Sequence, residues 1–248
     1  MSAAWGQGAG GMADTDTDTD TDTGTEGGRE AAGGPDTPPG SPFPFVGNAL
    51  ALDFVNTEVL VRKRPHDLLP APGAVAPWWG AAQARSPDAD LVGRDAAPLR
   101  CDEEGLRAVK EARAALRLVF GTLAEGRPLS PGELSPLNGL LRRAYHRLDA
   151  TPRGDVSPAY GTEGTGVERL LVAVALSAFR LIAQGERTRL RRCQNCIGLF
   201  YDTSKSATRR WCSEVCMNRA WSARHYARSK RRPGHGRATD GGVDGSTV

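Results

Sequence analysis

Residues 189–232 read RLRRCQNCIGLFYDTSKSATRRWCSEVCMNRAWSARHYARSKRR and contain four of the five cysteines of the chain. Two residues separate the first pair, fifteen follow it, and three separate the second pair. Two close pairs at this separation can place four thiolates around one tetrahedral Zn²⁺. Because four sulfur ligands leave no open position for water, we expect one structural zinc ion and not a catalytic one. Redox-active or unliganded cysteines are the alternative. The predicted ligands are Cys193, Cys196, Cys212 and Cys216.

The same segment is strongly basic. Thirteen lysines and arginines lie between Arg187 and Arg232, against the two acids Asp202 and Glu214, so this segment carries a net charge of +11. The whole chain of 248 residues carries only +3. A small module with this charge density is typical of nucleic-acid-binding proteins, since phosphates are its natural counterions.

The order of residues in this segment predicts a small β-hairpin followed by a helix. Residues 189–192 and 199–201 are expected to be two short strands, with a knuckle at Cys193 and Cys196 between them. A polar turn follows over residues 202–208, and a helix is expected to begin near Ser213, an N-cap residue type. The four cysteines would then come from a knuckle and from a helix start, as in treble-clef zinc fingers.

The preceding part of the chain is predicted to be α-rich. Apolar residues recur with the helical period of 3.6 residues over residues 102–123, with Asp102 as N-cap and Gly126 as the stop. A capping box at residues 130–133 opens a second helix, whose apolar stripe is expected to include Tyr145 and Leu148. Residues 150–163 are expected to form a loop or a weak hairpin, and residues 166–184 the central helix.

The residues before these helices predict a short β element. Residues 43–61, FPFVGNALALDFVNTEVLV, alternate apolar and small or polar side chains, which favours a strand or hairpin leading into a helix near Asn56 or Thr57. A short helix is expected around Trp78 and Trp79. The predicted fold class is therefore α+β and mostly α: a helical domain with a short N-terminal β element, followed by a small treble-clef-like zinc finger.

The motifs of the last segment resemble those of CGNR-type zinc fingers. WCSEVCMNR, LFYDTS and RRCQNC match the pattern of that family, although Met217 replaces its glycine and both cysteine pairs are shorter than C-x4-C. Upstream, FVGNALALDFVNT and Trp78 resemble the start of the ABATE domain, which usually precedes this finger. Proteins with this pairing are described as stress-induced transcription regulators in bacteria, so the resemblance implies a transcription regulator.

Four parts of the chain are expected. Residues 1–41 are acidic and of low complexity, which predicts a disordered tail. Residues 42–186 are expected to form the ABATE-like α-rich domain, residues 187–232 the zinc finger, and residues 233–248 a second disordered tail. A chain without a secretory signal or a long apolar run, with clustered cysteines, is typical of a reduced cytoplasmic protein that does not enter the membrane.

The leading functional hypothesis is a zinc-dependent, DNA-binding transcriptional regulator. In this hypothesis the finger reads double-stranded DNA, and the upstream domain acts as a sensor or an oligomerisation unit. The expected oligomer is a homodimer. Cations along the last helix and before it would contact phosphates, and Asn218, Ser222 and His225 would read base edges. An RNA-binding module and a protein-interaction module are the alternatives. The predicted nucleic-acid-binding residues are Arg209, Arg210, Asn218, Arg219, Arg224, Arg228 and Arg231.

Two further groups of side chains can be interpreted either as structural or as functional. The aromatic residues Phe200, Trp211, Trp221 and Tyr226 are expected to form the core of the finger, although they could stack on bases. Asp53, Asn56 and Thr57 are the best polar candidates outside the finger, but no catalytic fingerprint accompanies them. We therefore expect structural hydrogen bonds there and no enzymatic activity.

Overall fold

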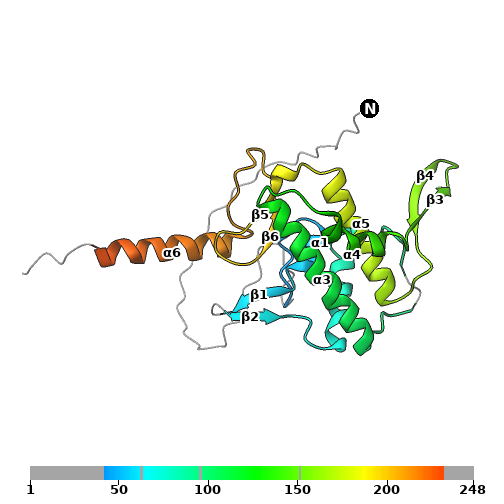
Figure 1. Cartoon of the computed structure of the whole chain (residues 1–248), viewed down its shortest axis with the longest axis horizontal. Coiled ribbons are helices and arrows are strands. Elements are labelled where there is room, and N and C mark those ends of the chain that lie inside the picture. Colours follow the sequence, from blue (N-terminus) through cyan, green and yellow to red (C-terminus); the bar gives the residue numbers. More distant parts are fainter. Residues whose placement is uncertain (1–41, 62–63, 95–96, 151, 232–248) are drawn as a thin grey trace, which may run out of the picture. The chain divides into compact units, whose positions relative to one another are not determined.

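Two long helices, α3 (Glu103–Ala124) and α5 (Val167–Ala183), pack against each other and carry much of the core (Figure 1). The Asp102 carboxylate accepts a hydrogen bond from the Gly105 backbone N–H at 2.8 Å, so Asp102 is the N-cap of α3 as predicted. In α5, every residue from Leu170 to Ala178 is buried. This confirms the prediction that α5 is the central helix, since a helix that is apolar on all sides must be covered on all sides.

The computed structural model describes residues 42–61, 64–94, 97–150 and 152–231. The two predicted disordered tails, 1–41 and 233–248, lie outside these residues. In the described part, the fold is mostly α with three small antiparallel hairpins, which confirms the predicted class. The other elements, in chain order, are α1 (Leu50–Val55), β1 (Glu58–Val61), β2 (Arg64–Asp67), η1 (Pro72–Ala74), α2 (Val75–Gln83), η2 (Pro87–Asp90), α4 (Pro131–Leu141), β3 (Tyr145–Ala150), β4 (Val156–Gly161), η3 (Arg187–Arg189), β5 (Leu190–Arg192), β6 (Leu199–Tyr201) and α6 (Glu214–Arg231).

The order of elements near the N-terminal end differs from the prediction. The segment LALDFV is helix α1, and the β1–β2 hairpin follows it, whereas a strand leading into a helix was expected. All six residues of α1 are buried, so the alternation of Leu50, Leu52 and Phe54 with smaller residues does not separate an inner from an outer face. For a short and fully buried segment, apolar periodicity does not distinguish a helix from a strand.

The second predicted helix is shorter than expected. The capping box at Ser130 and Glu133 is present, but α4 ends at Leu141. Tyr145 and Leu148 belong instead to β3, which pairs with β4 from Tyr145↔Gly161 to Ala150↔Val156. Leu148 is 74% exposed, so its helical spacing from Leu141 was a coincidence and did not reflect a buried stripe.

The side-chain amide of Asn56, at the end of α1, pairs with strand β6. Its Nδ2 donates to the Leu199 carbonyl oxygen at 2.8 Å, and its Oδ1 accepts from the Leu199 N–H at 2.9 Å. Further along the strand, the Tyr201 N–H donates to the Gly47 carbonyl oxygen at 2.9 Å, and the Asn48 side chain donates to the Tyr201 carbonyl oxygen at 2.9 Å. The free edge of β6 is thus bonded to the α1 segment much as a neighbouring strand would bond to it.

Arg117, on α3, joins three segments at the same place. Its guanidinium pairs with the Glu58 carboxylate at 2.8 Å, donates to the Ile197 carbonyl oxygen at 3.3 Å, and donates to the carbonyl oxygen of Val55. Since Ile197 lies between the first cysteine pair and β6, this one side chain ties the start of β1 and the end of α1 to the cysteine-rich segment. We refer to Asn56, Arg117 and Glu58 as the junction.

Arg113, one turn before Arg117, anchors the β1–β2 hairpin. Its side chain is 3% exposed and forms two hydrogen bonds with the Asp67 carboxylate, at 2.6 and 2.8 Å. It also donates to Thr57 Oγ1 at 3.0 Å. Partial burial raises the pKa of Asp67, but hydrogen bonds from Arg113 and from the Leu69 N–H outweigh it, so the pKa of Asp67 lies below its ordinary value.

Replacing Arg113 by Met should lower the free energy of unfolding by roughly 2–3 kcal/mol. This is less than the roughly 3–5 kcal/mol for breaking a fully buried pair, because the Asp67 carboxylate stays in contact with water. Since the pKa of Asp67 is lowered in the folded state, its contribution is complete above about pH 4 and is lost as the pH falls through the folded pKa. Urea unfolding at several pH values should therefore show the variant and the parent converge in acid. Arg107→Met, at an exposed position on the same helix, is the control.

Replacing Asn56 by Ala should destabilise the protein by about 1–3 kcal/mol for each buried backbone group left unpaired at Leu199. The exposed Asn138 of α4 offers a matched control, since Asn138→Ala should change stability by no more than about 0.5 kcal/mol. Equal stability of the two variants in thermal or urea unfolding would contradict the role of Asn56 at the junction.

Candidate metal centre and nucleic-acid interface

The four clustered cysteines bring their sulfur atoms into one group. The four Sγ atoms all lie within 4.8 Å of one another, and no pair of these cysteines forms a disulfide. Cys196 and Cys212 Sγ are 3.6 Å apart, and Cys212 and Cys216 Sγ are 3.7 Å apart. Sulfur ligands at about 2.3 Å from one tetrahedral centre are separated by about 3.8 Å, so the cluster has the dimensions of a four-sulfur zinc site.

Backbone N–H groups point at the sulfurs. The Gly198 N–H donates to Cys196 Sγ at 3.3 Å, and the N–H groups of Asn195 and Cys212 both donate to Cys193 Sγ at 3.5 Å. A Cβ atom at Gly198 would come within 3.2 Å of Cys196 Sγ, so glycine allows this close approach. Donors of this kind favour the thiolate form, which is the form that binds a metal ion.

The thiols are also coupled to one another. Hydrogen bonds from the thiols of Cys196, Cys212 and Cys216 lower the pKa of Cys193, and the bonds to Cys193, Cys196 and Cys216 raise the pKa of Cys212. A bound Zn²⁺ needs four thiolates, so metal binding at this site would release protons.

The loop between β6 and α6 is organised by a buried carboxylate and by arginines. Asp202 is fully buried and accepts hydrogen bonds from the Ser204 N–H at 2.9 Å and the Arg209 N–H at 2.8 Å. Burial raises the pKa of Asp202, but the bonds from Ser204 and Arg209 lower it overall. Arg189 donates to the Ser204 carbonyl oxygen at 2.8 Å, and Arg191 to that of Ala207 at 2.8 Å. Arg189 and Arg191 thus stabilise the backbone of the basic segment itself.

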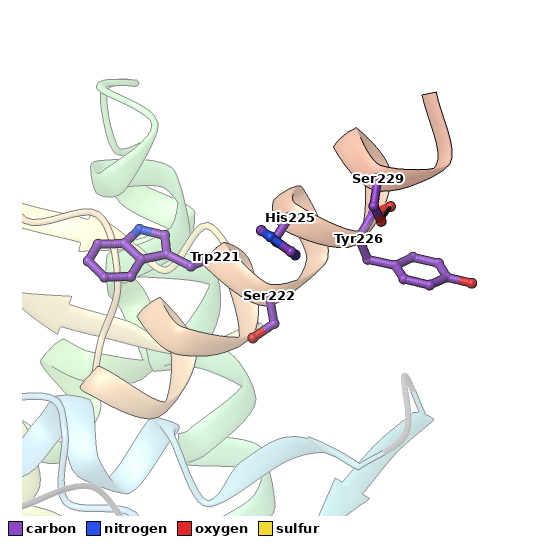
Figure 2. Close-up of a pocket in the computed structure, with 5 residues that line it drawn as sticks. All are labelled: Trp221, Ser222, His225, Tyr226 and Ser229. Carbon is purple, nitrogen blue, oxygen red and sulfur yellow. Dashed lines mark hydrogen bonds between the residues drawn. The ribbon is translucent and has the colours of Figure 1, made fainter. Parts of the chain in front are cut away.

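Helix α6 is partly buried in its first turns and exposed beyond them. Cys216 is buried in the first turn, whereas every residue from 221 to 230 is exposed. Figure 2 shows Trp221, Ser222, His225, Tyr226 and Ser229, which line a shallow hollow formed by this helix alone.

The prediction of a core role is confirmed for Phe200, which is fully buried, and Trp211 is half-buried against the cluster. It is wrong for Trp221 and Tyr226, which are 55% and 61% exposed, because this part of α6 extends beyond the core that could cover them.

The exposed part of α6 has a central face and two basic borders. At about 100° per residue, the five residues of Figure 2 and Asn218 fall within one broad face, and cations lie on both sides of it. This face carries hydroxyl, amide, imidazole and aromatic groups, whereas its borders carry positive charge. The border residues are Arg224 and Arg228 on one side and Arg219 and Lys230 on the other.

The structure places the predicted nucleic-acid-binding residues in two different environments. Arg210, Asn218, Arg219 and Arg228 are exposed, and Arg224 is exposed with its guanidinium 5.8 Å from the Trp211 ring centroid. Arg209 is half-buried: it donates to the carbonyl oxygens of Trp211 and Cys212, and it lies over the Phe200 ring. Arg231 is the last residue of α6, and the prediction for its side chain lies outside the described residues.

The polar candidates upstream of the finger are engaged in structural hydrogen bonds. Asp53 accepts from the Gly47 N–H at 2.7 Å, and Thr57 donates to the Phe54 carbonyl oxygen at 2.7 Å. Asn56 belongs to the junction described above. The sequence carried no sign of that junction, because its partners are backbone groups some 140 residues away.

None of the helices in the described part of the chain combines the length and the apolar character needed to cross a bilayer.

Comparison with known protein families finds two matches along the chain. Residues 48–185 match the ABATE family, whose description is "Putative stress-induced transcription regulator", and residues 189–229 match the CGNR zinc finger. No curated protein matches the chain. The ABATE match covers more than half of the 248 residues, and the four clustered sulfurs lie within the zinc-finger match. The chain belongs to the ABATE family and carries a CGNR zinc finger.

Proposed function

We propose that this protein is a zinc-dependent transcriptional regulator that binds double-stranded DNA through α6. The observation that carries the proposal is the exposed half of α6, in which a face of hydrogen-bonding and aromatic groups lies between two basic borders. An α-helix fits the major groove of B-DNA, where base edges face the centre of the helix and phosphates lie on both sides. The basic borders would contact phosphates, and the central face would contact bases.

In this proposal, Cys193, Cys196, Cys212 and Cys216 hold one structural zinc ion. The ion would fix the start of α6 relative to the β5–β6 hairpin, since the ligands come from both elements. The apolar core of the finger is small: besides the cysteines, it consists of Phe200 with Val46 and Trp211 against it. Ligation energy would therefore supply much of its stability. Arg209, which bonds to the finger's own carbonyl groups, would support the site more than it contacts DNA.

Residues 42–186 would act as a sensor or an oligomerisation unit, and we propose no enzymatic activity. The support for this is that Asp53, Asn56 and Thr57, the polar candidates of that region, serve the packing of α1. A homodimer is part of the proposal, because one finger buries a small interface and two would supply usable specificity. An RNA-binding role remains the second candidate, since the exposed Trp221 and Tyr226 could stack on unpaired bases.

Zinc content is the first test. Protein purified without chelator and dialysed should hold one zinc ion per chain by elemental analysis, and Cys212→Ser should lose it. Cys101→Ser is the matched control, because Cys101 is a half-buried cysteine outside the cluster. Removal of the metal with a strong chelator should also lower the melting temperature of the parent. Retention of a full zinc ion by Cys212→Ser would contradict the assigned ligand set.

DNA binding is the second test. Fluorescence anisotropy of a labelled mixed-sequence duplex, measured over a series of salt concentrations, should show binding by the zinc-loaded protein. The double variant Arg224→Ala/Arg228→Ala should bind more weakly, and its slope of log K against log salt should fall by about 1.8, or 0.9 for each lost phosphate contact. The variant Arg107→Ala/Arg142→Ala, at two exposed arginines of α3 and the α4 end, should leave both quantities unchanged.

Two results would count against this reading. If the two double variants bind equally, α6 is not the DNA-binding element. If single-stranded or duplex RNA binds more tightly than DNA at equal salt, the RNA-binding candidate replaces the proposal.

A further inference from the structure

The β1–β2 hairpin has one face attached to α3, and its opposite face is exposed at Val61, Arg64 and His66 and half-buried at Val59. In its register, Glu58 pairs with Asp67 and Leu60 with Pro65, while Val59 pairs with His66 and Val61 with Arg64. Paired residues share a face of the sheet, and neighbours along a strand alternate. The first face is held by α3, since Arg113 and Arg117 bind the carboxylates of Asp67 and Glu58. The second face therefore points away from α3.

The free face is basic near the tip of the hairpin. Arg64 and His66 are exposed, and Val61 is 48% exposed. In the part of the chain that the structure describes, no carboxylate forms an ion pair with Arg64. The acids of the hairpin are both used by α3, so the charge that remains for a partner is positive. Val61, Arg64 and His66 of this face line a shallow hollow on the surface together with Pro65, which belongs to the opposite face.

The hairpin is connected to the start of α6 through the junction and the cysteine cluster. Arg117 contacts both Glu58, the first residue of β1, and Ile197, which follows the first cysteine pair. Cys196 Sγ in turn lies 3.6 Å from Cys212 Sγ, next to the first turn of α6. In Figures 1 and 2 the β1–β2 hairpin extends on the same side of the helical region as α6. A partner that spans both elements would therefore meet positive charge on each of them.

We propose that the free face of the β1–β2 hairpin, through Arg64, is a second DNA contact that binds the sugar-phosphate backbone beside the groove occupied by α6. This rests on the proposed function, since it takes the same duplex as the partner. Duplex DNA fits because it carries dense phosphate on both sides of the groove, and a guanidinium can pair with phosphate through two hydrogen bonds. The junction would fix the spacing between the two contacts.

The test uses full-length, zinc-loaded protein and the mixed-sequence duplex described above. Arg64→Ala should weaken binding roughly three- to ten-fold near physiological salt and lower the salt slope by about 0.9. Arg64→Lys should keep the slope, since it keeps the charge. Arg142→Ala, at an exposed arginine at the end of α4, should change neither quantity. Unchanged melting temperatures would show that the variants are folded.

The outcomes separate this inference from the proposed function. If Arg64→Ala matches the parent while Arg224→Ala/Arg228→Ala loses binding, the hairpin contact is overturned and DNA binding by α6 stands. If neither variant differs from the parent, both proposals fail. A reduced slope for Arg64→Ala that Arg64→Lys restores would establish the second contact.

Discussion

The paired hydrogen bonds between the Asn56 amide and the Leu199 backbone are the interaction on which the arrangement of this protein most depends. Strand β6 is bonded to β5 on one edge only, and its other edge would otherwise leave buried polar groups unpaired. Asn56 satisfies these groups from the end of α1, with Gly47 and Asn48 completing the same edge. Because an unpaired buried group costs about 1–3 kcal/mol, this edge holds the finger firmly against the helical region.

The zinc finger is therefore not an isolated module on a linker. Leu190 and Leu199 of its hairpin belong to the main hydrophobic core, and Val46 from the upstream segment packs against the cysteine cluster. Arg192 also pairs with Glu125 at the end of α3, at 3.1 Å. A change in the packing of α1 or α3 would consequently reach the metal site through direct contacts. In the proposed function, this connection is the route by which the upstream region would act on the finger.

The basic charge of the last segment divides between two uses. Three arginines donate hydrogen bonds to backbone carbonyl oxygens of residues 202–212 and so stabilise the conformation of this loop: Arg189, Arg191 and Arg209. The cations of α6 beyond its first turns remain exposed. A net charge of +11 thus overstates the charge available to phosphates, and the exposed subset decides where a partner can bind.

The sequence alone determined the cysteine cluster, the hairpin-and-helix order of the finger, and the helices α3 and α5. These features are local: ligand spacing, N-caps such as Asp102 and helical periodicity act within a few residues of the chain. Tertiary structure decided that LALDFV is a helix, since complete burial removed its periodic signal, and that Tyr145 and Leu148 pair in a hairpin. It also decided that Trp221 and Tyr226 are exposed, because whether an aromatic residue becomes core depends on what covers it. The junction of Asn56, Arg117 and Glu58 joins groups up to about 140 residues apart, and no local pattern in the chain encodes such contacts.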